Sequence, residues 1–423
     1  MTKFADLHLS APIQQAIKDA GYTTPTPIQA QAIPVVMENR DVLGCAQTGT
    51  GKTAAFLLPM LDRLQQVEPS KQIKALILSP TRELAAQIGE SFSTYAKHTA
   101  LRHLVIFGGV KQEPQVKQLK RGVDVLVATP GRLLDLQGQG FIDLSQTVFF
   151  VLDEADRMLD MGFLPDIKRL LKLLPTDRQN LLFSATMPKD IVELASQFLQ
   201  DPVRVEVDRE SSTVEQIEQR VLFVEQSKKK QLLKSLLDSE QIAAAIVFTR
   251  TKHGANRVAT FLEKGGISAA AIHGNKSQNA RTRALDGFRE GTVKVLVATD
   301  IASRGIDVDL VSHVFNFDLP NLPESYVHRI GRTGRAGSTG QAIAFCSPDE
   351  AEYLVDIEAT IGQQVPDNRE HDWHHYPALE RVLVLREERK DAKERKKKSF
   401  NKAKKSKKPS FHRRRKGGRS RTR

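Results

Sequence analysis

The 423-residue sequence has very little of several features, and each shortage excludes a class of protein. It contains only two cysteines, Cys45 and Cys346, which lie far apart in apolar, strand-like segments. We therefore expect two buried thiols, not a disulfide or a metal site. No apolar run approaches the roughly 20 residues that span a bilayer. The first residues, MTKFADLHLS, lack the basic segment and apolar core of a signal peptide, so we expect a cytoplasmic protein without membrane contacts.

Net positive charge is missing from most of the chain and is concentrated at its end. Between Arg386 and Arg423 there are 20 Lys and Arg residues against four acids, a balance of +16, while the whole chain carries +13 and residues 1–385 carry −3. This end has almost no apolar residues to bury, which predicts a disordered, solvated tail. Its Lys and Arg residues, with Phe400 and Phe411 interspersed, favour a flexible arm that binds nucleic acid. A merely solubilising end is the alternative.

Apolar segments of strand length alternate with helical stretches along most of the chain. DVLGCA, KALILSP and VDVLVATP are examples in the first half, and AAAIVFTR and VKVLVATD are examples in the second. The alternation predicts an α/β fold with parallel sheets wrapped by helices. Because the pattern pauses in a polar stretch between Asp201 and Gln216 and then restarts, we expect two such domains joined by a linker.

The sheet pattern stops after about Glu350. His371, His374 and His375 follow it closely spaced, but without Cys or acidic partners at ligand spacing we interpret them as linker residues and not as metal ligands. The predicted boundaries are a first domain over 1–205, a linker over 206–217, a second domain over 218–360, a short C-terminal extension over 361–385 and the basic tail over 386–423.

The segment AQTGTGKT follows an apolar strand and precedes a helical stretch, which is the arrangement of a P-loop with Ala46 in place of the usual first Gly. Gly49 and Gly51 let the backbone turn sharply, so that its N–H groups and the positive end of the next helix face phosphate oxygens. Lys52 is expected to reach the β- and γ-phosphates, and the Thr53 hydroxyl to bind Mg²⁺. The predicted nucleotide-binding residues of this loop are Ala46, Gln47, Thr48, Gly49, Thr50, Gly51, Lys52 and Thr53.

A second apolar strand, VFFVL, runs directly into the acidic residues Asp153, Glu154 and Asp156. Buried strands do not normally end in three carboxylates unless a positive group lies there. In P-loop enzymes such a strand ends beside the phosphate loop with an acid that holds the metal. Asp153 fits that role, and Glu154 can orient or deprotonate the attacking water. We therefore predict that the positive group is Mg²⁺.

The acidic motif DEAD, together with AQTGTGKT, resembles the motifs of the DEAD-box RNA helicases, and the resemblance covers about residues 4 to 360. It implies two tandem RecA-like domains of the P-loop NTPase class, with ATP and Mg²⁺ as cofactors and RNA as the partner. The stretch GYTTPTPIQ is similar to the family's Q motif. This similarity implies that Gln29 reads the adenine edge, that Tyr22 packs nearby, and that Phe4 is the isolated aromatic upstream.

Further segments are similar to the motifs with which the family contacts RNA or couples ATP to RNA. SAT, from Ser184 through Ala185 to Thr186, resembles the motif that links the ATP state to duplex opening. PTRELA, the Gly108–Gly109 pair and TPGR lie in the first half, and VFTR and HGNKSQNAR lie in the second. The implied RNA-binding residues are Pro80, Thr81, Arg82, Gly109, Thr129, Pro130, Gly131, Arg132, Arg250, Gln278, Arg281, Thr299 and Arg304.

Two segments of the second half, ATDIASRGID and HRIGRTGR, match the motifs that close over ATP. The first supplies Asp307 and departs slightly from the family, which often has Ala in the position of Ser303. In the second, Arg332 and Arg335 are expected to act as arginine fingers, because hydrolysis builds charge on the γ-phosphate. Both would come from the second domain, so catalysis requires domain closure. Taken alone, this Arg-rich segment could also contact RNA phosphates; the resemblance favours the ATP role.

The same motif contributes two residues that we expect to couple the domains. These are His328 and Arg329, and we expect Arg329 to bridge to the motifs of the first domain.

The leading hypothesis is an ATP-dependent RNA helicase that binds single strands across both domains and melts short duplexes locally. An RNA chaperone or ATP-gated clamp, with annealing by the basic tail, is the alternative. The Q motif and the DEAD motif argue against a DNA helicase, and the absence of membrane contacts argues against a transport ATPase. The short extension with a basic end is most similar to bacterial RhlE-type members, which implies work on ribosomal precursors or with the RNA-decay machinery. We expect a monomeric core.

Overall fold

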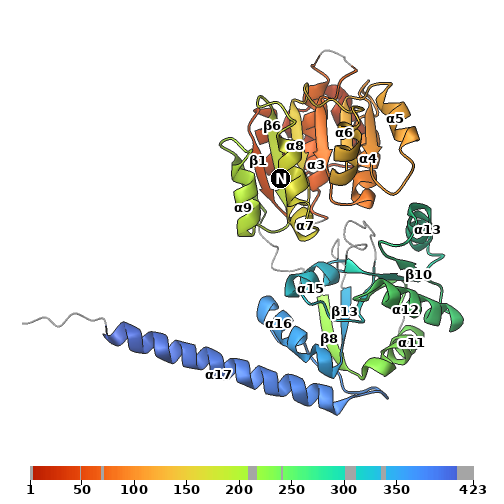
Figure 1. The fold of residues 1–423 in the computed structure, drawn as a ribbon, viewed down its shortest axis with the longest axis vertical. Coiled ribbons are helices and arrows are strands. Elements are labelled where there is room, and N and C mark those ends of the chain that lie inside the picture. Colours follow the sequence, from red (N-terminus) through yellow and green to blue (C-terminus); the bar gives the residue numbers. More distant parts are fainter. Residues whose placement is uncertain are drawn as a thin grey trace, which may run out of the picture.

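The computed structural model describes residues 3–47, 49–67, 71–207, 217–239, 242–300, 311–334 and 340–406, with side chains to residue 392. These residues form two α/β units, each built on a parallel sheet, and a long C-terminal helix (Figure 1). The predicted fold class of two tandem RecA-like domains is confirmed. Residues 208–216, most of the predicted linker, lie outside the described part of the chain.

The first domain contains a seven-stranded sheet within the described residues, in the order β3-β4-β2-β5-β6-β1-β7. Every pairing in it is parallel. Its strands are β1 (Val42–Cys45), β2 (Ala75–Leu78), β3 (His103–Ile106), β4 (Val125–Ala128), β5 (Phe149–Leu152), β6 (Gln179–Ser184) and β7 (Val203–Glu206). Its helices are η1 (Phe4–Leu7), α1 (Ala11–Asp19), α2 (Pro27–Met37), α3 (Lys52–Leu64), α4 (Arg82–Tyr95), α5 (Glu113–Leu119), α6 (Pro130–Gly138), α7 (Ala155–Asp160), α8 (Leu164–Leu171) and α9 (Lys189–Ser196).

The second domain has a six-stranded parallel sheet in its described part, in the order β10-β11-β9-β12-β13-β8. The strands are β8 (Ile217–Phe223), β9 (Ala245–Phe248), β10 (Ala269–Ile272), β11 (Val295–Ala298), β12 (His313–Asn316) and β13 (Gly340–Cys346). The helices are η2 (Gln226–Lys228), α11 (Lys229–Ser239), α12 (Lys252–Lys264), α13 (Gln278–Arg289), α15 (Pro323–Ile330), η3 (Pro348–Glu350), α16 (Ala351–Ile361) and α17 (Tyr376–Ser406).

Uninterrupted apolar runs form the central strands because both faces of each sheet are covered by helices. In β2, Ala75 and Ile77 join the core beneath α2, α3 and α4, whereas Leu76 and Leu78 join the core beneath α6, α8 and α9. The alternation follows from the two-residue period of a strand. It leaves only the carboxyl ends of the strands, with the loops that follow them, free to carry polar groups, and the sequence motifs lie there.

The C-terminal segment differs from the prediction of a disordered tail from residue 386. Helix α17 continues through Ser406 and projects away from the second domain (Figure 1). Ala378, Leu379 and Val382 of its first turns are buried against α16, and beyond them Arg386 forms an ion pair with Glu358. Lys, Arg, Glu and Ala are good helix formers, so a segment with little to bury can still continue a helix that is anchored at one end. Residues 407–423 lie outside the described residues.

The predicted extension runs along the edge strand of the second sheet. Val224 of the chain after β8 pairs with His374, and the N–H of His375 donates to the carbonyl of Phe223. In the portion that the structure describes, no group of three or more His, Cys, Asp or Glu side chains is placed to hold a metal ion. No helix of that portion is both long enough and apolar enough to cross a bilayer. Cys346 is buried, Cys45 is half-buried, and both are free thiols.

Candidate active site and RNA interface

The phosphate loop connects β1 to α3, which begins at Lys52. Gly49 and Gly51 have φ of 89° and 91°, in the left-handed region that favours glycine. At Gly51 a side chain is also excluded by space, because an added Cβ would lie 2.3 Å from Nε2 of Gln29. Thr50 Oγ1 donates to the carbonyl of Gln47 at 2.7 Å and closes the turn. Thr48 lies outside the described residues.

Lys52 places a buried positive charge at the phosphate loop. Its side chain is buried, at 6% exposed, and its Nζ has no hydrogen-bond partner. A buried ammonium without a hydrogen-bonded anion is costly, even with the charges of Asp153 and Glu154 nearby, so the position favours a negatively charged ligand. The phosphates of a nucleotide would supply that charge, together with acceptors for the loop N–H groups and the amino end of α3. The residues present therefore fit a bound nucleoside triphosphate.

Asp153 follows β5 and lies 2% exposed beside this loop. Burial raises the pKa of Asp153 to about 7, although the charge of Lys52 acts in the opposite direction. An anionic carboxylate in such a position is stabilised by a divalent cation, and Mg²⁺ prefers hard oxygen ligands. Thr53 follows Lys52 in the first turn of α3. The carboxylate of Asp153 and the hydroxyl of Thr53 are oxygen ligands of the kind that a Mg²⁺ site requires.

Glu154 is held in an unusual conformation directly after Asp153. Its φ of 51° lies in the left-handed region, which is uncommon outside glycine and concentrates at functional sites. Its Oε2 lies 2.6 Å from Nη1 of Arg157, and both side chains are buried. Burial alone would raise the pKa of Glu154, but Arg157, Lys52 and Arg332 together outweigh it and lower the pKa to about 2. Glu154 is therefore a carboxylate surrounded by cations.

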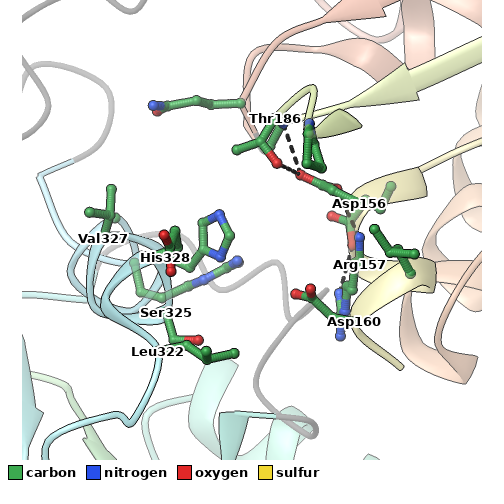
Figure 2. A pocket seen from close by; sticks show the side chains of 16 residues that line it. Asp156, Arg157, Asp160, Thr186, Leu322, Ser325, Val327 and His328 are labelled. Carbon is green, nitrogen blue, oxygen red and sulfur yellow. Dashed lines mark hydrogen bonds and ion pairs between the residues drawn. The ribbon is translucent and has the colours of Figure 1, made fainter. Parts of the chain in front are cut away.

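Asp156 ties the acidic motif to the segment Ser184–Thr186. Its Oδ2 accepts hydrogen bonds at 2.8 Å from both the backbone N–H and the hydroxyl of Thr186, as Figure 2 shows. The N–H of Asp156 donates to Oγ of Ser184 at 3.1 Å. Between them, the carbonyl of Ala185 accepts a weak bond from the thiol of Cys45 at the end of β1. These hydrogen bonds connect the acidic motif directly to the segment Ser184–Thr186.

A cavity of about 540 Å³ separates these residues from α15 of the second domain. Its first-domain wall includes Glu154. Asp156 and Arg157 of the same wall face Ser325 and His328 of the opposite wall across the space (Figure 2). Arg332 lies in the same lining just after α15 and is close enough to lower the pKa of Glu154. Arg335 and Asp307 lie outside the described residues.

Arg329 does not bridge the domains, which corrects our expectation. It is 2% exposed, and its guanidinium bonds Asp300 at 2.6 and 2.8 Å, the Asn316 side chain at 3.0 Å and the Asp318 carbonyl at 2.6 Å. It also lies 5.1 Å from the ring of Phe248. All these groups belong to the second domain. The helical spacing that puts His328 on the cavity face of α15 puts the next residue on the face toward the sheet.

The adenine motif is arranged partly as expected. Gln29 Oε1 accepts from the N–H of Thr26 at 2.9 Å, and its Nε2 donates to the carbonyl of Gly51 at 3.1 Å, so this side chain links α2 to the phosphate loop. Tyr22 is 47% exposed and available for a flat ligand. Phe4, by contrast, is 5% exposed within the first-domain core, and its contact with the nucleotide stays a prediction. An aromatic residue before the motif serves equally well as a core residue, and the sequence could not distinguish the two.

The predicted RNA residues of the first domain gather at the carboxyl ends of β2, β3 and β4. Gly109 packs closely against Arg82: a Cβ added to Gly109 would lie 2.2 Å from Nη1 of Arg82. Arg132 Nη2 donates to the carbonyl of Val110 at 3.1 Å, and Thr81 Oγ1 caps α4 by accepting from a backbone N–H. Pro80 lies just before that cap, and Thr129, Pro130 and Gly131 form the start of α6.

The two domains meet at an ion pair that sequence reasoning missed. Glu83 Oε2 lies 2.9 Å from Nη2 of Arg281, and the two side chains are 5% and 8% exposed. Gln278 completes the contact, because its Oε1 accepts from Arg82 at 3.4 Å and its Nε2 donates to Glu83 at 3.2 Å. Glu83 stands inside PTRELA, so its place in a predicted RNA motif was the available signal.

The remaining predicted RNA residues lie in the second domain. Arg250 follows β9 and is half-exposed, with its guanidinium 3.1 Å from Oε1 of Glu350 and 5.2 Å from the ring of Tyr353. Thr299 follows β11, and its N–H donates to the carbonyl of Ile272. Arg304 is outside the described residues.

Two sheets with a phosphate loop, an acidic strand end and an arginine from the facing domain define a two-domain P-loop ATPase. The family model of the DEAD/DEAH box helicase matches residues 26–194, and that of the helicase conserved C-terminal domain matches residues 228–337. The DEAD-box ATP-dependent RNA helicase CshA of Bacillus subtilis is 45% identical over 380 residues, covering 90% of this chain and 75% of that protein. The RNA helicase CrhR of Synechocystis is 47% identical over 363 residues, covering 86% and 73%.

The solved structure of S. cerevisiae Dbp5 bound to RNA and ADP BeF3 is similar to this chain, with a TM-score of 0.76 and 34% identity over 86% of this chain and 96% of that one. The chain belongs to the DEAD-box ATP-dependent RNA helicases, enzymes that hydrolyse ATP and bind RNA. The predicted family and enzyme class are thereby confirmed, whereas the expected similarity to RhlE-type members stays a prediction.

Proposed function

We propose that this RNA helicase melts short RNA duplexes locally, with one domain closure per ATP and without processive movement. The observation that carries the proposal is the buried ion pair of Glu83 with Arg281, which lies among the predicted RNA contacts of both domains. In the same structure Arg332 of the second domain lies close enough to Glu154 of the first for its charge to lower the pKa of Glu154. The ATP site and the RNA face are therefore completed together. The likeness to Dbp5 bound to RNA and ADP BeF3 covers 86% of this chain and supports a role for both domains in binding RNA and nucleotide.

The proposed ATP chemistry divides among a few residues. Lys52 holds the β- and γ-phosphates, and Thr53 and Asp153 hold Mg²⁺, which supplies charge stabilisation to the phosphoryl group when bound. Glu154 orients the attacking water and accepts its proton. Arg332, with Arg335, stabilises the charge that develops on the γ-phosphate, and the remaining residues of the loop from Ala46 to Thr53 together with Asp307 position the nucleotide. We also propose that the first domain ends at residue 205, that the second begins at residue 218, and that the predicted RNA-binding residues contact RNA.

ATP hydrolysis measured with RNA, with DNA and without nucleic acid tests this function. We expect RNA alone to stimulate hydrolysis strongly, and we expect short duplexes to be separated while long ones are not. Glu154→Gln should still bind ATP and RNA but hydrolyse ATP at least a hundredfold more slowly, since general bases contribute about 10²–10⁴. Equal stimulation by DNA, or normal turnover by Glu154→Gln, would contradict the proposal.

A second candidate function, an RNA chaperone or clamp, is favoured by the basic end of the chain. Residues 393–423 contain 17 Lys and Arg residues and one acid, and a segment of that charge can anneal strands by screening phosphates. Annealing of complementary RNAs that persists without ATP, and in Glu154→Gln, would assign that activity to the basic end. For the cellular role we propose a cytoplasmic monomer that acts on ribosomal precursors or in RNA decay, which an RNA crosslinking map from living cells would test.

A further inference from the structure

The proposed general base has a buried partner that none of the functional motifs includes. Arg157 is the first residue after the DEAD motif, and its Nη1 lies 2.6 Å from Oε2 of Glu154. The two side chains are 6% and 7% exposed. A charge-assisted hydrogen bond at this distance, screened from water, has a narrow range of geometries. The direction of the Glu154 carboxylate is therefore set by Arg157.

The backbone makes such a restraint necessary. Glu154 is the N-cap of α7 with φ 51° and ψ 54°, and its side chain does not cap the helix. A residue in the left-handed region is strained and persists only where the surrounding structure holds it. Arg157 is one turn further along α7, at the spacing where side chains of a helix meet. Its own N–H donates to Oδ1 of Asp156 at 2.9 Å, which anchors the start of the turn.

Arg157 also occupies a defined place between the domains. With Glu154 it lines the cavity on the first-domain side. Figure 2 shows Arg157 across this cavity from Ser325 and His328 of α15. The adjacent Asp156 holds Thr186. Two successive residues of α7 thus fix two functional elements, the base and the coupling segment, relative to the surface that the second domain closes upon.

We propose that Arg157 is a positioning residue for ATP hydrolysis, which holds the carboxylate of Glu154 at the cavity edge where water must attack. It does so without contacting the nucleotide. The inference rests on the proposed role of Glu154 and deepens it. If the ion pair only stabilised α7, replacing Arg157 would change the rate of hydrolysis equally with and without the Glu154 carboxylate.

The test is a double-mutant cycle of Arg157→Gln with Glu154→Gln, followed by ATP hydrolysis under saturating RNA and, for slow variants, in single turnovers. Arg157→Gln should lower kcat about ten- to a hundredfold, because a misplacement near 1 Å can cost that much, while KM for ATP changes less than twofold. In the Glu154→Gln background the same substitution should change the residual rate less than twofold. Arg157→Lys, which keeps one charged donor, should recover part of kcat.

Arg169→Gln is the matched control, because Arg169 also pairs three residues away along a helix, with Asp166, but its side chain is 69% exposed. It should leave kcat unchanged. If Arg157→Gln slows hydrolysis equally in both backgrounds, or raises KM and leaves kcat intact, the positioning role is wrong. Should Arg157→Gln unfold, the cycle is run with Arg157→Lys, where a full-size loss in the Glu154→Gln background would again overturn the inference. Normal turnover by Glu154→Gln alone would instead refute the proposed role of the base.

Discussion

At the scale of single residues, this active site contains charged groups that the free protein does not satisfy. Lys52 has a buried Nζ without a hydrogen-bond partner, and Asp153 is an almost fully buried carboxyl. A bound nucleotide and a bound cation would offset these two costs. Such a site trades stability for function. The residues that carry the chemistry should therefore be those whose replacement stabilises the free protein.

Asp153→Asn tests this trade. Burial raises the pKa of Asp153 to about 7, well above the ordinary range of an Asp carboxyl, so the folded protein disfavours the ionised form. Stability of the unliganded wild type is full below about pH 4 and is lost as the pH rises through 7, by up to about 4 kcal/mol from this group. The variant lacks this loss. Without nucleotide and Mg²⁺, its thermal midpoint should exceed that of the wild type by several degrees at pH 8 and equal it near pH 4. A constant difference at both pH values would contradict the assignment.

Gln29 is expected to confer adenine selectivity, because an amide can pair with both the N6 donor and the N7 acceptor. Gln29 also anchors the phosphate loop through the carbonyl of Gly51, so part of its effect should be shared by all nucleotides. Gln29→Ala should raise KM for ATP more than KM for GTP, although both should rise. Steady-state hydrolysis with each nucleotide measures this. Equal increases would mean that Gln29 only supports the loop.

At the scale of elements, the two domains communicate through helix ends. α4 and α13 meet at the ion pair of Glu83 with Arg281, and α7 faces α15 across the cavity. In both contacts the first-domain side comes from a helix that begins directly after a strand, α4 after β2 and α7 after β5. Closure is therefore a contact between rigid parts, and a single buried ion pair can bias it.

Glu83→Gln should weaken closure, because it leaves the guanidinium of Arg281 in an interface without its anion. Breaking a buried pair costs about 3–5 kcal/mol, so the closed population measured by interdomain fluorescence transfer with RNA and a non-hydrolysable ATP analogue should fall strongly. ATP affinity without RNA should not change. Asp286→Asn is the control, since Asp286 pairs with Arg289 on the same α13 but both are exposed. Equal effects of the two variants would show that the pair does not hold the domains.

At the scale of the whole molecule, the excess positive charge lies outside the two folded domains. The two domains form the catalytic body, and the basic segment leaves it on α17, which projects into solvent (Figure 1). Arg386 and Arg389 still belong to the body, since they pair with Glu358 and Asp356 of α16. Removal of the basic segment should therefore begin beyond these residues.

Ending the chain at Ala392 removes a charge of +16 but leaves these ion pairs in place. Stability and RNA-free ATP hydrolysis should barely change. RNA should bind more weakly and with a shallower slope of log affinity against log salt, by roughly 0.7 for each lost phosphate contact. Duplex melting should suffer most at low enzyme concentration, because the tail tethers the core near its substrate. A full-length variant with Gln at the Lys and Arg positions of 393–423 tests whether charge or length matters. If the slope of log affinity against log salt is the same in the wild type and both variants, the segment is only a solubilising end.

The sequence by itself determined the features that depend on local chemistry. Glycine spacing and a following helix define the phosphate loop, an apolar strand that ends in acids defines the metal side, and alternation of strand and helix defines the two sheets. These patterns repeat wherever the same local geometry is needed. They could therefore be interpreted without knowing which segments meet.

Only the tertiary structure decided which side chains meet across the chain. Phe4 is buried in the core, Arg329 faces its own sheet, and Glu83 meets Arg281 in the other domain, none of which follows from motif spacing. Over residues 386–406 the structure differs from the predicted disorder for a related reason, because composition reports what a segment can bury and not that α16 anchors the helix from which it continues. Partners distant in sequence are selected by packing of whole elements, and that selection is a property of the folded molecule.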